Sequence, residues 1–285
     1  MPSAGSLLLA IGLSGILLPL TFGPFWGWSS WSVVASLLVA GSALVLLGLH
    51  ERPSARPLVA PELYRGNRMF AVACASALLT YAAVYGVGLL TAVYLQVVQG
   101  LSASAAGAIL LVQPVMMACL APLAGRLYDR VGSRGLTTAG SLVMALGTLV
   151  LGATAPQGSW PEAMVGLALI GLGLALFSTP NISAILGSVA PDRLSLASAV
   201  LGTNRFVGQA LSVALLGAIA AAQLSGPAGV SLTAQIAATG EAATFVAGYR
   251  WALVVGAGIA AAAAAAAMVS ANRGRPGLPG DTQGD

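Results

Sequence analysis

Long apolar runs dominate this 285-residue sequence. Each run is about 20 residues long, and a helix of that length spans the roughly 30 Å hydrocarbon core of a bilayer. Eight such runs occur, at residues 6–24, 31–49, 70–94, 104–124, 136–154, 162–187, 197–222 and 248–271. Because every backbone polar group inside a bilayer must be hydrogen-bonded within the protein, we expect eight transmembrane helices and an all-α, polytopic membrane fold.

Composition excludes the soluble alternatives. Charged residues make up 7% of the chain and hydrophobic residues 58%, whereas soluble proteins are about one quarter charged. The chain therefore lacks the polar surface of a soluble enzyme, a nucleic-acid-binding module or a disordered protein. His50 is the single histidine, which excludes a histidine-based metal site. We expect the lipid bilayer as the main partner, with no nucleic acid, metal or cofactor.

The arginines predict the orientation. Ten of the 12 basic residues, all arginine, fall in the segments 50–69, 125–135 and 188–196 and in the tail after residue 272. Cytoplasmic loops carry such an excess of positive charge. We therefore expect a multi-pass protein of the plasma (inner) membrane with both termini in the cytoplasm. All five tryptophans lie at span ends on the arginine-poor side, as expected for a membrane-interface belt.

Loop composition suggests four segments. Residues 1–49 form a transmembrane helix pair, and residues 50–69 form a cytoplasmic linker with several prolines and charges. Residues 70–272 form a six-helix unit. The Gly- and Pro-rich tail 273–285 reads as disordered.

The most informative loop reads APLAGRLYDRVGSRG, between the fourth and fifth spans. Gly125 lets one helix end pack closely, and Gly132 allows a turn with positive φ. Asp129 can sit at a helix N-terminus or pair with an arginine. Arg130 and Arg134 face the cytoplasm. This pattern resembles the cytoplasmic-loop signature of the major facilitator superfamily, in the copy within its C-terminal half, and there it acts as an inner gate.

Neighbouring stretches extend the resemblance. YLQVVQGLSASAAGAILLVQP, PNISAILGSVAPDR and NRFVGQALSVALLGA are similar to the fourteen-helix drug/proton antiporter branch, the EmrB/QacA type. The opening helix pair looks like that branch's extra central pair. Members of that branch have six further helices before this pair, so the chain resembles only their C-terminal eight helices. These comprise the central pair and the C-terminal half of a major facilitator fold. Within that half, residues 70–154 and 162–271 are expected to form inverted three-helix repeats.

The resemblance implies a transporter that exports small amphipathic compounds, such as drugs, by proton antiport with alternating access. Its partners are then a small-molecule substrate, protons and a separate N-terminal six-helix half. An alternative is a non-transporting membrane partner subunit that pairs with such a half. A membrane-embedded enzyme needs clustered intramembrane His, Asp or Glu, and the interiors of the predicted spans contain no Asp or Glu, since Glu162 lies at the outer edge of its run.

Two sets of polar residues inside the spans are candidates for the substrate pathway. Arg205 lies about two turns into the seventh span, where it either snorkels to the inner headgroups or faces a central cavity or a partner acid. Arg250 reads as an outer-interface anchor at the mouth of the last helix. Tyr81 and Tyr85 are four residues apart and share a helix face. The resemblance places that face on the cavity wall, and helix packing is the alternative.

Amides near prolines form the second set. Gln113 precedes Pro114 and Asn181 follows Pro180. Proline frees a backbone carbonyl that an adjacent amide can satisfy, so a helix kink is one interpretation and a hinge or cavity role is the other. Asn204 lies in the inner half of the seventh span, with the same alternatives.

Overall fold

The described part of the chain is almost entirely helical. The computed structural model describes residues 30–51, 61–64, 66–157, 160–222 and 240–269, positions 224 and 236, and scattered helical positions between 5 and 19. The predicted tail 273–285 lies outside the described residues, as do residues 52–60 of the linker. The predicted first span, 6–24, is described only in part.

Seven helical segments of the described chain are long and apolar enough to cross a membrane. Together with the helical positions near the N-terminus, they agree with the eight predicted spans. The labelled helices are α2 (Trp31–Glu51), α3 (Pro61–Tyr64), α4 (Arg68–Val93), α5 (Ala103–Leu110), α6 (Val112–Val131), α7 (Ser133–Thr154), α8 (Trp160–Gly187), α9 (Leu194–Ala221) and α11 (Ala242–Val269).

Proline divides one span, as its position predicts. Pro114 has no N–H and its ring crowds the carbonyl of the fourth residue before it, which is Leu110. Helix α5 ends at Leu110 and α6 begins at Val112. Pro180, in contrast, lies within α8, which continues through it to Gly187.

The last span begins earlier than expected. Helix α11 starts at Ala242 rather than at residue 248 because residues 242–247 also form regular helix, so Arg250 and Trp251 lie within the helix and not at its mouth. The 28 residues of α11 are about 42 Å long, which exceeds the hydrocarbon thickness of about 30 Å. The first turns can therefore project beyond the hydrocarbon core.

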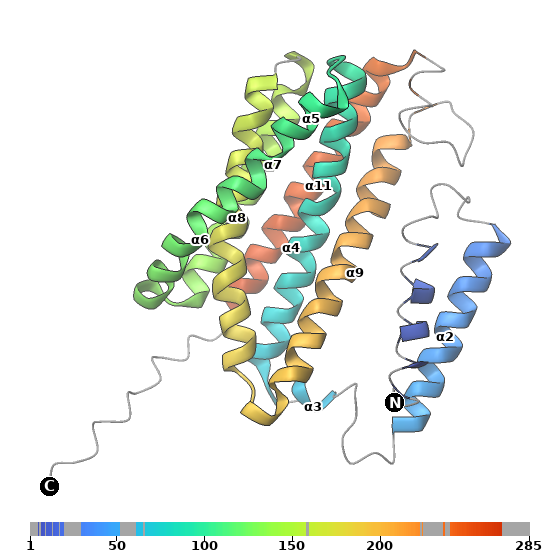
Figure 1. Cartoon of the computed structure of the whole chain (residues 1–285), viewed down its shortest axis with the longest axis vertical. Coiled ribbons are helices and arrows are strands. Elements are labelled where there is room, and N and C mark those ends of the chain that lie inside the picture. Colours follow the sequence, from blue (N-terminus) through green and yellow to red (C-terminus); the bar gives the residue numbers. More distant parts are fainter. Residues whose placement is uncertain are drawn as a thin grey trace, which may run out of the picture.

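Six spans form one bundle, and their pairwise packing has a two-fold pattern (Figure 1). Helix α8 packs against α6 and α7, while α4 packs correspondingly against α9 and α11. Helices α7 and α11 also pack against each other. Exchange of α4 with α8, α6 with α9 and α7 with α11 leaves this set of contacts unchanged.

Small residues bring α4 and α9 into backbone contact. A Cβ added at Gly208 of α9 would lie 2.7 Å from the Leu78 carbonyl oxygen, and one added at Gly86 of α4 would lie 2.6 Å from the Ser212 carbonyl oxygen. The Gly86 N–H also donates to the Ser212 hydroxyl, at 2.8 Å. Glycine is required at both positions because any side chain would push the helices apart.

Burial is uneven around the bundle. In the apolar stretch of each span, we compare the share of residues that are buried. This share is 61% in α4, in α7 and in α8, but 28% in α9 and 11% in the α5–α6 segment. Helix α2, which Figure 1 draws to one side of the bundle, is 22% buried. Two bundle helices therefore present long open faces in the described part of the chain.

Candidate functional site: the loop end of the bundle and the α4–α9 face

The predicted gate loop forms a tight turn between α6 and α7. Gly132 lies between the two helices with φ 81° and ψ 173°, and its N–H donates to the Tyr128 carbonyl at 2.9 Å. This positive φ was expected from the sequence. The turn defines the motif end of the bundle, where α4, α7 and α9 begin and α6, α8 and α11 end.

The other residues of the predicted gate motif lie on α6 and α7. Arg130 lies in the last turn of α6 and Arg134 in the first turn of α7, both exposed. Close packing at Gly125 was the wrong expectation for the described residues, since a Cβ there would meet no atom within 4 Å. The backbone of Asp129 is helical, and its side chain lies outside the described residues.

A second apolar cluster joins the linker to the motif end. Leu63 of α3 is 4% exposed and packs with Phe70 and Cys74 of α4, Ile185 of α8 and Ala197 of α9. The short helix α3 therefore ties three spans together at this end.

Polar contacts reinforce the cluster. Tyr64 packs edge-on against Phe70, with 5.2 Å between ring centroids, and is within hydrogen-bonding reach of Asn204 and Cys74. Burial raises the pKa of the Tyr64 phenol above its usual value of 10, so the hydroxyl remains a neutral donor. Asn204, predicted on the substrate pathway, is thus engaged with the linker helix.

Asn181 is also engaged in packing. It is 3% exposed and accepts a hydrogen bond from the Ser76 hydroxyl of α4 at 3.3 Å. Ser76, Asn181 and Thr137 of α7 line a void of about 10 Å³, a volume comparable to a single water molecule. The amide beside Pro180 therefore joins α8 to α4 near the motif end.

The remaining predicted pathway residues lie on α4, α6 and α9. The Arg205 guanidinium of α9 stacks on the Tyr81 ring of α4, with 5.5 Å from Cζ to the ring centroid. Tyr85 follows one turn later and is 54% exposed. Gln113 is half-buried beside the α5–α6 break. The structure brings Arg205 and Tyr81 together and leaves Asn181 and Asn204 in separate contacts.

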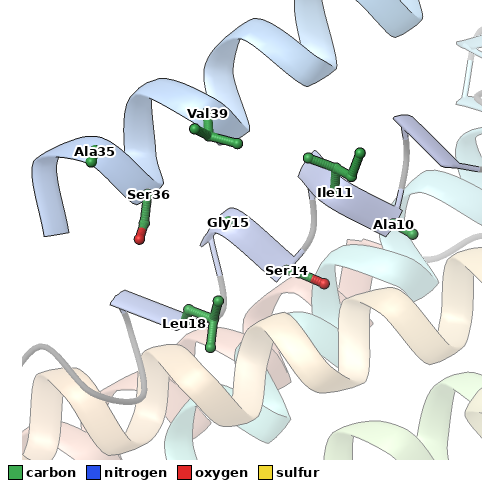
Figure 2. A pocket seen from close by; sticks show the side chains of 8 residues that line it. All are labelled: Ala10, Ile11, Ser14, Gly15, Leu18, Ala35, Ser36 and Val39. Atoms are coloured by element: carbon green, nitrogen blue, oxygen red, sulfur yellow. The ribbon is translucent and has the colours of Figure 1, made fainter. Parts of the chain in front are cut away.

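A well-defined pocket lies elsewhere and contains none of the predicted residues. It measures about 460 Å³ and lies between α2 and the helical positions before it (Figure 2). Its lining consists of Ala10, Ile11, Ser14, Gly15, Leu18, Ala35, Ser36 and Val39. Ligand sites combine such a volume with convergent polar groups, whereas this groove has two serines, one of which, Ser36, already donates to the Ser32 carbonyl at 2.7 Å.

Three structural features were not predicted from the sequence. Asn67 accepts from the Phe70 N–H at 3.1 Å as the N-cap of α4 and donates to the Ser188 carbonyl beyond α8 at 2.6 Å. An asparagine just before an apolar run is a recognisable N-cap signal. The π-helical segment Tyr94–Val98 that continues α4, and the stacking of Tyr94 on Tyr249 at 5.1 Å, had no comparable local signal.

A bundle of spanning helices joined by a glycine turn, with polar side chains paired in its interior, is the architecture of a multi-pass membrane protein. The profile of the Major Facilitator Superfamily matches residues 3–213. The chain belongs to this family.

Known relatives agree with this assignment. The chain is 32% identical to the multidrug resistance protein Stp of Mycobacterium tuberculosis over 78% of its own length and 41% of that protein. It is 28% identical to the methylenomycin A resistance protein of Streptomyces coelicolor, over 75% of the chain and 45% of the relative. The chain thus spans less than half the length of these relatives.

A solved structure has the same fold. A bacterial homologue of the human lysosomal transporter Spinster, in an inward-facing and occupied conformation, superposes with a TM-score of 0.56. The match covers 92% of this chain and 66% of that protein, at 19% sequence identity. At this identity the similarity concerns the fold alone.

Proposed function

We propose that this chain is the C-terminal eight-helix part of a fourteen-helix drug/proton antiporter, which exports small amphipathic compounds. The observation that carries the proposal is the open side of the bundle. In the apolar stretches of α5–α6 and α9, only 11% and 28% of the residues are buried. Helix α9 also carries the charged Arg205 within its span. Charged side chains within membrane spans face a protein interior or an aqueous path rather than lipid.

In this proposal, an N-terminal six-helix half covers this side of the bundle. Alternating access moves one half of such a transporter against the other around a site near the bilayer midplane. Spanning less than half of its relatives is consistent with this assignment. The multidrug and antibiotic resistance named for those relatives supports export of small compounds.

The same proposal assigns the segments. Residues 1–49 are the central helix pair, 50–69 the linker, and 70–272 a domain of two inverted repeats, 70–154 and 162–271. The exchange pattern among the six bundle helices supports the repeats. The arginine excess supports a cytoplasmic motif end, with both termini on that side.

The motif end acts as the inner gate in this proposal. The rigid Gly132 turn holds Arg130 and Arg134 at adjoining helix ends, and Asp129 supplies a carboxylate for charge-assisted contacts that form when the gate is shut. Tyr81, Tyr85, Gln113 and Arg205 provide the substrate-facing wall, while Asn181 and Asn204 hold its helices in place.

Proton coupling depends on the other half. The carboxylates of the described spans lie at the ends of the bundle: Glu162 is in the first turn of α8, at the end opposite the motif, and Asp192 is just before α9, at the motif end. A proton carrier near the midplane must therefore come from a second polypeptide segment.

Proteoliposomes test this function. The purified chain is reconstituted with an imposed pH gradient and a fluorescent amphipathic dye, alone or with the N-terminal portion of the Stp relative. We expect uncoupler-sensitive dye movement only when both segments are present. Gradient-driven movement by the chain alone would contradict the proposal, and an inert chain that binds the N-terminal segment would identify a non-transporting subunit.

A further inference from the structure

We propose that Arg205 binds an anionic group of the transported compound, such as a carboxylate, phosphate or sulfonate. The inference rests on the proposed export function and specifies its substrate class: amphipathic molecules with an acidic group. It is carried by the depth of Arg205 in the membrane, by its contact with Tyr81 and by the positions of the acidic residues.

Depth separates Arg205 from the arginines at the membrane surface. It lies 11 residues beyond Leu194, the first residue of α9, which corresponds to about 16 Å along the helix axis. Half of the hydrocarbon core is about 15 Å thick. The guanidinium stacks on Tyr81, which is 13 residues beyond Arg68 at the start of α4 and thus about 20 Å from the motif end. The Arg205 guanidinium is therefore held about three turns inside the motif end of the bundle, whereas Arg130 and Arg134 lie at the helix ends.

The helix crossing makes this contact possible. Gly208, three residues after Arg205, lies against the backbone of Leu78 and the Cβ of Tyr81. A larger residue at position 208 would separate the two helices. The aromatic ring thus meets the guanidinium because α4 and α9 touch at this level.

The described acidic residues lie at the ends of the bundle. Glu162 is in the first turn of α8, and Glu241 precedes α11 at the same end. Asp192 lies in the short turn before α9, at the motif end. Arg205 thus has an aromatic neighbour at its own level in the membrane, and the described carboxylates are at other levels.

The chemistry of this pair suits an anion. A guanidinium has five N–H donors in a planar fork that matches carboxylate and phosphate oxygens. Contact with the Tyr81 ring restricts the side chain without using these donors. The exposed ring of Tyr85, one turn further along α4, offers an apolar surface for the rest of an amphipathic molecule.

Binding of two matched probes tests the proposal. The whole chain is placed in phosphatidylcholine nanodiscs and titrated with 1-pyrenebutyrate, an anion, and 1-pyrenebutanol, its neutral counterpart, with empty discs subtracted. We expect the native chain to bind the carboxylate about tenfold more tightly than the alcohol, as for a hydrogen bond to a charged group. Arg205→Gln should abolish the preference and leave alcohol binding unchanged. Arg250→Gln is the matched control, because Arg250 is also an exposed arginine within a helix, and it should retain the preference.

Each other outcome has a distinct meaning. Equal binding of the two probes to the native chain, or equal loss of preference in both variants, would overturn the anion site. If neither probe bound saturably, the anion site on this chain would be overturned, while the export function would still be decided by the proteoliposome assay with both segments. A preference that disappears when phosphatidylglycerol is added to the discs would assign Arg205 to lipid headgroups and overturn the proposal.

Discussion

The contact between α4 and α9 can be tested by a single methyl group at Gly208. A Cβ there would lie 2.7 Å from the Leu78 carbonyl oxygen, whereas ordinary contacts begin at 3.4 Å, so the helices must separate locally by about 0.7 Å. Overpacking of this kind costs about 1–3 kcal/mol. Alanine also gains about 0.8–1.0 kcal/mol over glycine within a helix. We therefore expect Gly208→Ala to destabilise the chain by up to about 2 kcal/mol.

A matched control lies on the same helix. A Cβ at Gly217 would meet no atom within 4 Å, so Gly217→Ala should stabilise the chain by about 0.8–1.0 kcal/mol. The difference between the two variants, about 1–3 kcal/mol, isolates the overpacking cost. Reversible unfolding in detergent, followed by circular dichroism, measures both. Equal stability of the two variants would refute the close α4–α9 contact, and with it the reason why Arg205 meets Tyr81.

Three further predictions concern the motif end and the orientation. Gly132→Ala should destabilise the chain by about 1–3 kcal/mol, because a backbone with φ 81° and ψ 173° is nearly exclusive to glycine. Gly125→Ala, at an open helical position, should not destabilise the chain. The same unfolding measurement compares the two variants. In a complete transporter, Asp129→Asn should favour the inward-open state by about 1–3 kcal/mol, because charge-assisted contacts are lost. Cysteine accessibility from the inner side and the transport rate measure this shift. If both were unchanged, Asp129 would be only a solvated charge in the loop. Cysteines at positions 54 and 280, in a background lacking the native cysteines, should resist membrane-impermeant reagents in intact cells, and their labelling from outside would reverse the predicted topology.

Local sequence patterns were sufficient to predict much of the architecture. The number of spans follows from the length of the apolar runs, and the division between α5 and α6 follows from Pro114. The turn at Gly132 follows from the need for positive φ between two helices. The start of α11 at Ala242 was missed because apolar pattern does not mark where a helix leaves the hydrocarbon core.

The candidate site was only partly predictable. The sequence identifies four polar residues within spans, but it does not indicate which residues they contact. These four are Arg205, Tyr81, Asn181 and Asn204. In the structure Arg205 joins Tyr81, Asn181 joins Ser76, and Asn204 lies within reach of Tyr64 from the linker. Two of the four residues therefore hold helices together. The other two, exposed Arg205 and half-buried Tyr81, form the pair from which the anion site is inferred.

The sequence by itself determined that the bilayer is the main solvent of this protein, how many spans it has and where the glycine turn between α6 and α7 lies. These properties depend on the composition and length of contiguous segments, and each segment satisfies its own backbone hydrogen bonds. Only the tertiary structure decided which faces of α4 and α9 meet and which polar side chains become partners. Those pairings depend on helix crossings set by small residues: Gly86 meets Ser212, 126 positions later in the chain, and Gly208 meets Leu78. No local sequence pattern indicates that these residues pack together.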